Sequence, residues 1–276
     1  VGGYTGMVAL RDFIIVRYNS DGSLDTGFDT DGKVVTAVSG VDDYLEGLAI
    51  QSDGKIIAVG YSNNDIAVVR YNTDGSLDTG FGSNGIIIQS VNTGGDYAYN
   101  VAIQEDGKIV VAGTTDNGTN IDFVLLRLNN NGSLDTGFDT DGIVTSPISA
   151  ADESGRALAI QSDGKIVIAG YVWTPTGKFM VLRYKTDGSI DAGFANNGKK
   201  VDYYGSYSNH AYAVALQSDG KIVVAGSINN GTDDDFGVAR YTGATQLLPT
   251  ATEQWTGGGA EANNGIPLNT YYHDNL

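Results

Sequence analysis

The sequence lacks cysteine and contains little proline or positive charge. With no Cys among its 276 residues, disulfide frameworks and thiolate metal sites are excluded. Only 16 residues are Lys or Arg against 33 Asp or Glu, which gives a formal charge of −17. Such a negative surface repels phosphate backbones, so we expect no nucleic-acid partner. No apolar run reaches the roughly 18 residues that a membrane-spanning helix requires, so we expect no membrane span.

The chain is built from an internal repeat of about 55 residues. The motif Gln-Ser-Asp-Gly-Lys at 51–55 recurs, with one change, from Gln104, and then from Gln161 and Gln217, at intervals of 53, 57 and 56 residues. The motif Asp-Gly-Ser-Leu-Asp-Thr-Gly-Phe, at 74–81, also returns in register. An arginine that ends an apolar run marks five copies: Arg17, Arg70, Arg127, Arg183 and Arg240.

Each repeat predicts four short strands. In one copy these lie at about 45–51, 55–61, 66–71 and 86–91, with a tight Ser-Asp-Gly turn between the first two. Second strands, such as 109–112, are apolar on both faces, which indicates sheets covered on both sides. A glycine near the end of these strands, such as Gly113, suggests a bulge or a close backbone approach. Four strands per repeat are typical of a propeller blade, so the fold class is an all-β propeller of four-stranded antiparallel blades.

The repeat boundaries predict about five blade equivalents. Residues 1–242 form the propeller, divided into a partial blade at 1–38, blades at about 44–91, 97–148 and 155–204, and a partial blade at 211–242. The array is either incomplete at both ends or closed by strands from the two termini. Residues 243–276 have no counterpart in the repeats and form either a linker or a tail that packs as a replacement strand.

Two motifs resemble those of the delta-60 repeat family of bacterial β-propellers. They are Asp-Ile-Ala-Val-Val-Arg-Tyr-Asn-Thr-Asp-Gly-Ser-Leu-Asp-Thr-Gly-Phe at 65–81 and Ala-Ile-Gln-Glu-Asp-Gly-Lys-Ile-Val-Val-Ala-Gly at 102–113. The resemblance covers about residues 1–242. It implies a propeller of large, often surface-exposed bacterial proteins with no established catalytic activity. We therefore expect a secreted or cell-surface location of the bacterial type.

The repeated arginines and the Asp-Thr-Gly motifs predict structural pairs. Asp-Thr-Gly is the signature of aspartic proteases, but one copy per blade would keep the carboxylates apart rather than let two share a proton. A charge at the end of a strand needs a partner when it is buried. We expect each arginine to pair with the aspartate of the connector in its own blade: Asp25, Asp78, Asp135 and Asp191.

Two connectors carry carboxylates at alternate positions, which is the arrangement that calcium would use. These candidate metal ligands are Asp29, Asp31, Asp139 and Asp141. The third acidic position and distal Glu of a full calcium loop are absent, and ordinary turns are the alternative. No other cofactor is expected.

The repeats differ most in the loops of one face. The uniform Asp-Gly-Lys turns and the long connectors would lie on one face of the propeller. The divergent loops would lie on the opposite face. A constant face opposite a varied one suggests recognition of protein or glycan on the varied face, although neutral variation of exposed loops predicts the same pattern. The aromatic candidates for ligand binding there are Tyr97, Trp173, Tyr204 and Tyr207.

These features favour a non-catalytic extracellular or cell-surface propeller that acts as a scaffold and a protein- or glycan-binding module. One alternative is a structural subunit of an extracellular fibre, in which the tail at 243–276 complements a neighbouring chain. The other is a glycan-acting enzyme with its site at the central funnel of the propeller.

Overall fold

The computed structural model describes residues 1–6, 10–145, 149–174, 176–204 and 207–242, and every regular element in this part is a β-strand. Within these ranges there is no helix of the length and hydrophobicity needed to cross a membrane. The strands are β1 (Gly2–Tyr4), β2 (Phe13–Val16), β3 (Lys33–Thr36), β4 (Asp43–Ile50), β5 (Ile56–Ser62), β6 (Asp65–Tyr71), β7 (Ile86–Gln89), β8 (Asp96–Ile103), β9 (Ile109–Asp116), β10 (Ile121–Leu128), β11 (Ile143–Thr145), β12 (Asp152–Ile160), β13 (Ile166–Trp173), β14 (Lys178–Tyr184), β15 (Lys199–Asp202), β16 (Asn209–Leu216), β17 (Ile222–Asn229) and β18 (Asp234–Tyr241).

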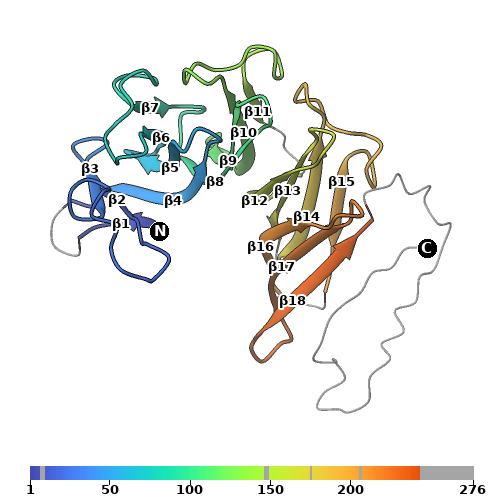
Figure 1. The fold of residues 1–276 in the computed structure, drawn as a ribbon. Coiled ribbons are helices and arrows are strands. Elements are labelled where there is room, and N and C mark those ends of the chain that lie inside the picture. Colours follow the sequence, from blue (N-terminus) through green and yellow to red (C-terminus); the bar gives the residue numbers. More distant parts are fainter. Residues whose placement is uncertain (7–9, 146–148, 175, 205–206, 243–276) are drawn as a thin grey trace, which may run out of the picture.

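The strands form five antiparallel sheets in chain order. Three sheets have four strands, namely β4 to β7, β8 to β11 and β12 to β15, whereas β1 to β3 and β16 to β18 form three-stranded sheets. Figure 1 shows the sheets following one another around an arc that is not closed in the described part of the chain. This arrangement confirms the predicted all-β propeller; in the described part of the chain its first and last sheets have three strands each.

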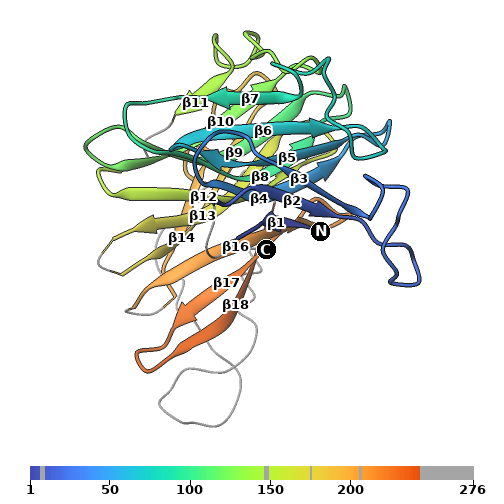
Figure 2. The ribbon, with the colours of Figure 1, turned by 90° about the vertical axis from the view of Figure 1, so that its left-hand side faces the viewer.

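The first strand of each of the last four sheets lies innermost. Strands β4, β8, β12 and β16 contact one another in succession, and the later strands of each sheet spread outward. Figure 2, turned by 90°, shows β16 to β18 at one end of the array and loops projecting from both ends of the strands. Because neighbouring strands are antiparallel, the divergent loops meet the start of each innermost strand, and the Asp-Gly-Lys turns follow its end.

Packing between adjacent sheets forms the core. Strand β9 is buried along nearly its whole length because one of its faces packs against the preceding blade and the other against the following blade. Val111 belongs to the cluster shared with the second blade, and Val110 and Ala112 to the cluster shared with the fourth. Alternate residues of one strand thus face two different cores, which explains its unbroken apolar sequence.

Each of the four innermost strands contains a β-bulge at the same repeat position. In β8 the pairing with β9 shifts between Ala98 and Asn100, so Tyr99 is the extra residue. A Cβ added to Gly113, on the facing strand, would lie 1.9 Å from the carbonyl oxygen of Tyr97. The predicted close backbone approach at this glycine is therefore confirmed. The bulged residues of the four blades are Glu46, Tyr99, Arg156 and Tyr212.

The four predicted arginine–aspartate pairs are in contact. Their Nε–Oδ2 distances are 2.7 Å in the first blade, 2.8 Å in the second, 2.7 Å in the third and 2.8 Å in the fourth. Each guanidinium also lies over a connector phenylalanine, 4.4 to 4.8 Å from the ring centroid. In the third blade, Arg127 Nη1 donates to the carbonyl of Thr186 in the fourth, which ties the two connectors together. Arg240 lies in β18, and the connector that would follow it falls outside the described residues.

Candidate functional site

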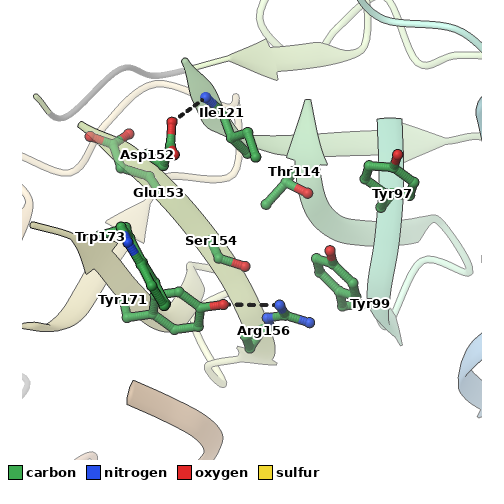
Figure 3. Close-up of a pocket in the computed structure, with 10 residues that line it drawn as sticks. All are labelled: Tyr97, Tyr99, Thr114, Ile121, Asp152, Glu153, Ser154, Arg156, Tyr171 and Trp173. Atoms are coloured by element: carbon green, nitrogen blue, oxygen red, sulfur yellow. Dashed lines mark hydrogen bonds between the residues drawn. The ribbon is translucent and has the colours of Figure 1, made fainter. Parts of the chain in front are cut away.

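A pocket lies between the third and fourth blades, on the side of the divergent loops (Figure 3). It encloses about 190 Å³ and draws its lining from β8, β9, β10, β12 and β13. The lining residues are Tyr97, Tyr99, Thr114, Ile121, Asp152, Glu153, Ser154, Arg156, Tyr171 and Trp173. Because these strands come from two sheets, the pocket exists only where two blades meet.

Arg156 is the bulged residue of β12 and the cation of this pocket. Its Nη2 donates a hydrogen bond of 2.9 Å to Tyr171 Oη, and its Cζ lies 3.9 Å from the ring centroid of Tyr99. Figure 3 shows the guanidinium between these two phenol side chains. Its buried Nε has no hydrogen-bond partner, and no carboxylate in the described part of the chain lies within ion-pair distance of it.

The acidic residues of the pocket are bonded to loop backbone. Asp152 Oδ1 accepts a hydrogen bond of 2.9 Å from the N–H of Ile121, and Glu153 Oε1 accepts one of 2.6 Å from the N–H of Ser149. Glu153 is fully buried. These carboxylates therefore hold the strand ends and loops that shape the pocket.

Glu46, the bulged residue of β4, does not line the pocket but lies close enough to Arg156 for the two charges to interact. Burial raises the pKa of Glu46, and the positive charge of Arg156 acts in the opposite direction. The four bulge positions thus carry one carboxylate (Glu46), one guanidinium (Arg156) and two phenols (Tyr99 and Tyr212).

Aromatic side chains extend the pocket toward the fifth blade. Trp173 stacks on His210 with ring centroids 5.2 Å apart, and Tyr171 meets the same imidazole edge-on at 4.5 Å. Burial lowers the pKa of His210; Asp234 opposes this and Arg156 adds to it. The net effect favours the neutral imidazole. Trp173 keeps more than half of its surface exposed, so it forms an aromatic rim.

The structure brings together two of the four predicted aromatic ligand-binding residues. Tyr97 and Trp173 line opposite sides of the pocket. Tyr204 instead packs against Phe179 and lies 3.0 Å, oxygen to oxygen, from the hydroxyl of Tyr241. Tyr207 is exposed on another loop and does not line the pocket.

The calcium candidates lie in tight turns. Asp31 Oδ1 and Asp141 Oδ1 each accept a 2.9 Å hydrogen bond from the backbone N–H two residues further on. Asp29 and Asp139 have positive φ angles of 44° and 46°, and their N–H groups bond to carbonyls of the next blade. No cluster of three or more acidic, His or Cys ligands occurs in the residues described. Calcium at these turns stays a prediction.

Sequence reasoning missed Arg156, Tyr99 and the other bulged residues. A signal was available, since these positions recur at intervals of 53, 57 and 56 residues. This position changes between Glu, Tyr, Arg and Tyr, whereas the residue before it is always small or apolar. Chemical variation at one position of a repeated unit is typical of a ligand-facing site.

The repeated blades and the central pocket define a β-propeller repeat protein. The chain belongs to the family described as "Domain of unknown function (DUF5122) beta-propeller", whose model matches residues 1–28, 51–81, 104–138, 161–194 and 217–243. No curated protein has a sequence that matches this chain.

Solved structures with similar folds include several enzymes. A polysaccharide lyase of family PL25, an ulvan lyase, aligns with a TM-score of 0.54 at 9% identity over 86% of this chain and 59% of that chain. A protein of unknown function from Bacteroides caccae aligns with a TM-score of 0.45 at 13% identity, over 87% of this chain and 72% of that one. An endo-arabinase from Bacteroides thetaiotaomicron aligns with a TM-score of 0.41 at 12% identity, over 71% and 73%. The chain spans less than two thirds of the lyase.

The prediction that this chain is not an enzyme is contradicted by its fold similarity to an enzymatic propeller. It rested on a repeat resemblance with no established catalysis, whereas the similar folds include a polysaccharide lyase. At these identities the likeness is one of fold alone. A propeller fold supplies the scaffold, and the side chains of the site decide the chemistry.

Proposed function

We propose that this chain is a glycan-acting propeller with its site in the central funnel. The observation that carries the proposal is the arrangement of Arg156 between Tyr99 and Tyr171 in a pocket rimmed by exposed Trp173. Aromatic faces pack against the apolar C–H faces of sugar rings, while phenol and guanidinium groups bond to sugar oxygens. The ulvan lyase of similar fold, which has also been solved with a glucuronate–rhamnose 3-sulfate ligand, supports this substrate class.

The pocket residues do not favour glycoside hydrolysis by a carboxylate pair. That chemistry places two carboxyl groups about 5 to 9.5 Å apart on opposite sides of the scissile bond. Asp152 and Glu153 are adjacent on one strand, so their side chains leave it on opposite faces, and each is bonded to loop backbone. The guanidinium–phenol pair of Arg156 and Tyr171 instead suits reactions in which negative charge develops on the substrate.

The test is depolymerisation and binding of a panel of purified polysaccharides. Chain shortening is followed by size-exclusion chromatography and affinity by calorimetry. The Trp173→Ala variant should bind its best polymer about tenfold more weakly, corresponding to loss of one aromatic contact of about 1.5 kcal/mol. Tyr207→Ala is the matched control, because Tyr207 is equally exposed but lies outside the pocket. Equal affinity of Trp173→Ala and wild type would argue against this site.

Three narrower assignments belong with this proposal. A secreted or cell-surface location of the bacterial type is supported by the Cys-free, acidic composition and by a polymeric substrate that would be met outside the cell. Membership of the delta-60 repeats is supported by the two motifs that return in register. The fibre alternative depends on residues 243–276, which lie outside the described part of the chain.

A further inference from the structure

We infer that the glycan is acidic and that Arg156 is the residue that selects it, by binding a sugar carboxylate through its Nη atoms. This inference rests on the proposed function, because it specifies the substrate class of the same pocket. It concerns recognition and holds whether the bound glycan is then cleaved by elimination or by another route.

The hydrogen-bonding capacity of Arg156 is largely unused. A guanidinium carries five N–H donors, and in the described residues Arg156 makes a single hydrogen bond, to Tyr171 Oη. The repeat arginines provide the internal comparison: Arg127 bonds to Asp135 and to the carbonyl of Thr186. A half-buried cation without an ion-pair partner lowers the free energy of unfolding, and such groups are common at functional sites.

The guanidinium is also held in place. Its backbone is fixed by the bulge between Gly155 and Ala157, its face lies on Tyr99, and one Nη is bonded to Tyr171. A side chain that is already ordered loses little conformational entropy when it binds an anion. The planar fork matches a carboxylate through two parallel hydrogen bonds.

The acids of the pocket do not compensate this charge. Asp152 and Glu153 bond to backbone N–H groups, and Glu46 lies beyond ion-pair distance from Arg156. The overall charge of −17 opposes the approach of an acidic polymer. At physiological ionic strength, however, charges more than about 8 Å away are screened, so the nearby guanidinium dominates at contact.

The experiment uses matched polymers that differ only in charge. One set is the glucuronate–rhamnose 3-sulfate polymer, the same polymer after carboxyl reduction to glucose, and the same polymer after desulfation. The second is polygalacturonate and its methyl ester. Calorimetric affinities are measured for wild type, Arg156→Gln, Arg156→Lys and Lys221→Gln. The last is a control that removes one partly exposed charge, paired with Asp219, from a turn outside the pocket.

The expected result is a loss of affinity confined to carboxylated polymers. Arg156→Gln should bind them about 10- to 100-fold more weakly, as expected for one charge-assisted bidentate contact. Arg156→Lys should lose less, and Lys221→Gln should match wild type. Wild type should bind the carboxyl-reduced and methyl-esterified polymers as weakly as Arg156→Gln binds the acidic ones.

The alternative outcomes separate the two proposals. If wild type binds neutral and acidic polymers equally and Arg156→Gln does the same, the selection of acid is wrong while a glycan site stands. If affinity follows sulfate rather than carboxylate, the carboxylate assignment is overturned. If no polymer binds to wild type or to any variant, the proposed function fails and this inference fails with it. Equal melting temperatures of Arg156→Gln and wild type ensure that a loss of binding is not a loss of fold.

Discussion

The Arg127→Met substitution tests whether the repeated arginine–aspartate pairs stabilise the blades. Arg127 and Asp135 are 7% and 11% exposed, and the Nε–Oδ2 distance is 2.7 Å. Removing one partner of a buried pair costs about 3 to 5 kcal/mol because the other charge is left buried. Lys108 Nζ lies 2.9 Å from the same carboxylate oxygen, so it still compensates part of the negative charge of Asp135 in the variant. We therefore expect a loss of about 3 kcal/mol, which lowers the melting temperature by about 6 to 12 °C for a domain of this size.

The first blade supplies the matched control. Arg17 and Asp25 have the same spacing and the same 2.7 Å contact, but their side chains are 35% and 29% exposed. Arg17→Met should therefore cost less than about 1 kcal/mol. The double variant Arg127→Met/Asp135→Leu should recover most of the lost stability, because a well-packed apolar pair can replace a buried ion pair. Urea and thermal midpoints measure all three variants, and equal midpoints for Arg127→Met and wild type would refute the reasoning.

Two further predictions concern the close backbone approach opposite a bulge and the loss of stability at acid pH. Gly113→Ala should destabilise the fold by at least about 3 kcal/mol, since its Cβ would lie 1.9 Å from a carbonyl oxygen. The control, Gly3→Ala, has no atom within 4 Å of its added Cβ and should change the urea midpoint little. The hydrogen bond from Lys55 lowers the pKa of Asp78, so its contribution to stability is complete above the unfolded value of about 4 and is lost as pH falls through the lower folded pKa. Asp78→Asn should flatten this part of the curve of urea midpoint against pH between pH 6 and 2, and an unchanged slope would contradict the assignment.

The blade was predictable because its information is local and repeated. Asp-Gly turns, apolar strand runs and the arginine landmark return at nearly constant spacing, so each copy corroborates the others. The partner of Arg127 was predictable for the same reason, since Asp135 is eight residues away in the same repeat. The sequence also predicted a close backbone approach at Gly113, although not which neighbouring strand would bulge.

The pocket was only partly predictable. Loop divergence and aromatic character pointed to Tyr97 and Trp173, which line it, but also to Tyr204 and Tyr207, which do not. Composition cannot separate an aromatic residue that packs under a loop from one that faces a cavity, because both uses bury apolar surface.

The amino-acid sequence by itself determined the four-stranded unit, its copy number and its burial on both faces, because turn chemistry and strand periodicity act within one repeat. Only the tertiary structure decided which side chains share the funnel. Arg156 and Tyr99 are 57 residues apart in the sequence and lie in two different sheets, yet their side chains are in contact. Both are bulged residues, which are left out of the regular strand pairing. Pairing register and the angle between adjacent blades are set by packing between sheets, so the chemistry at the centre emerges only when the blades assemble.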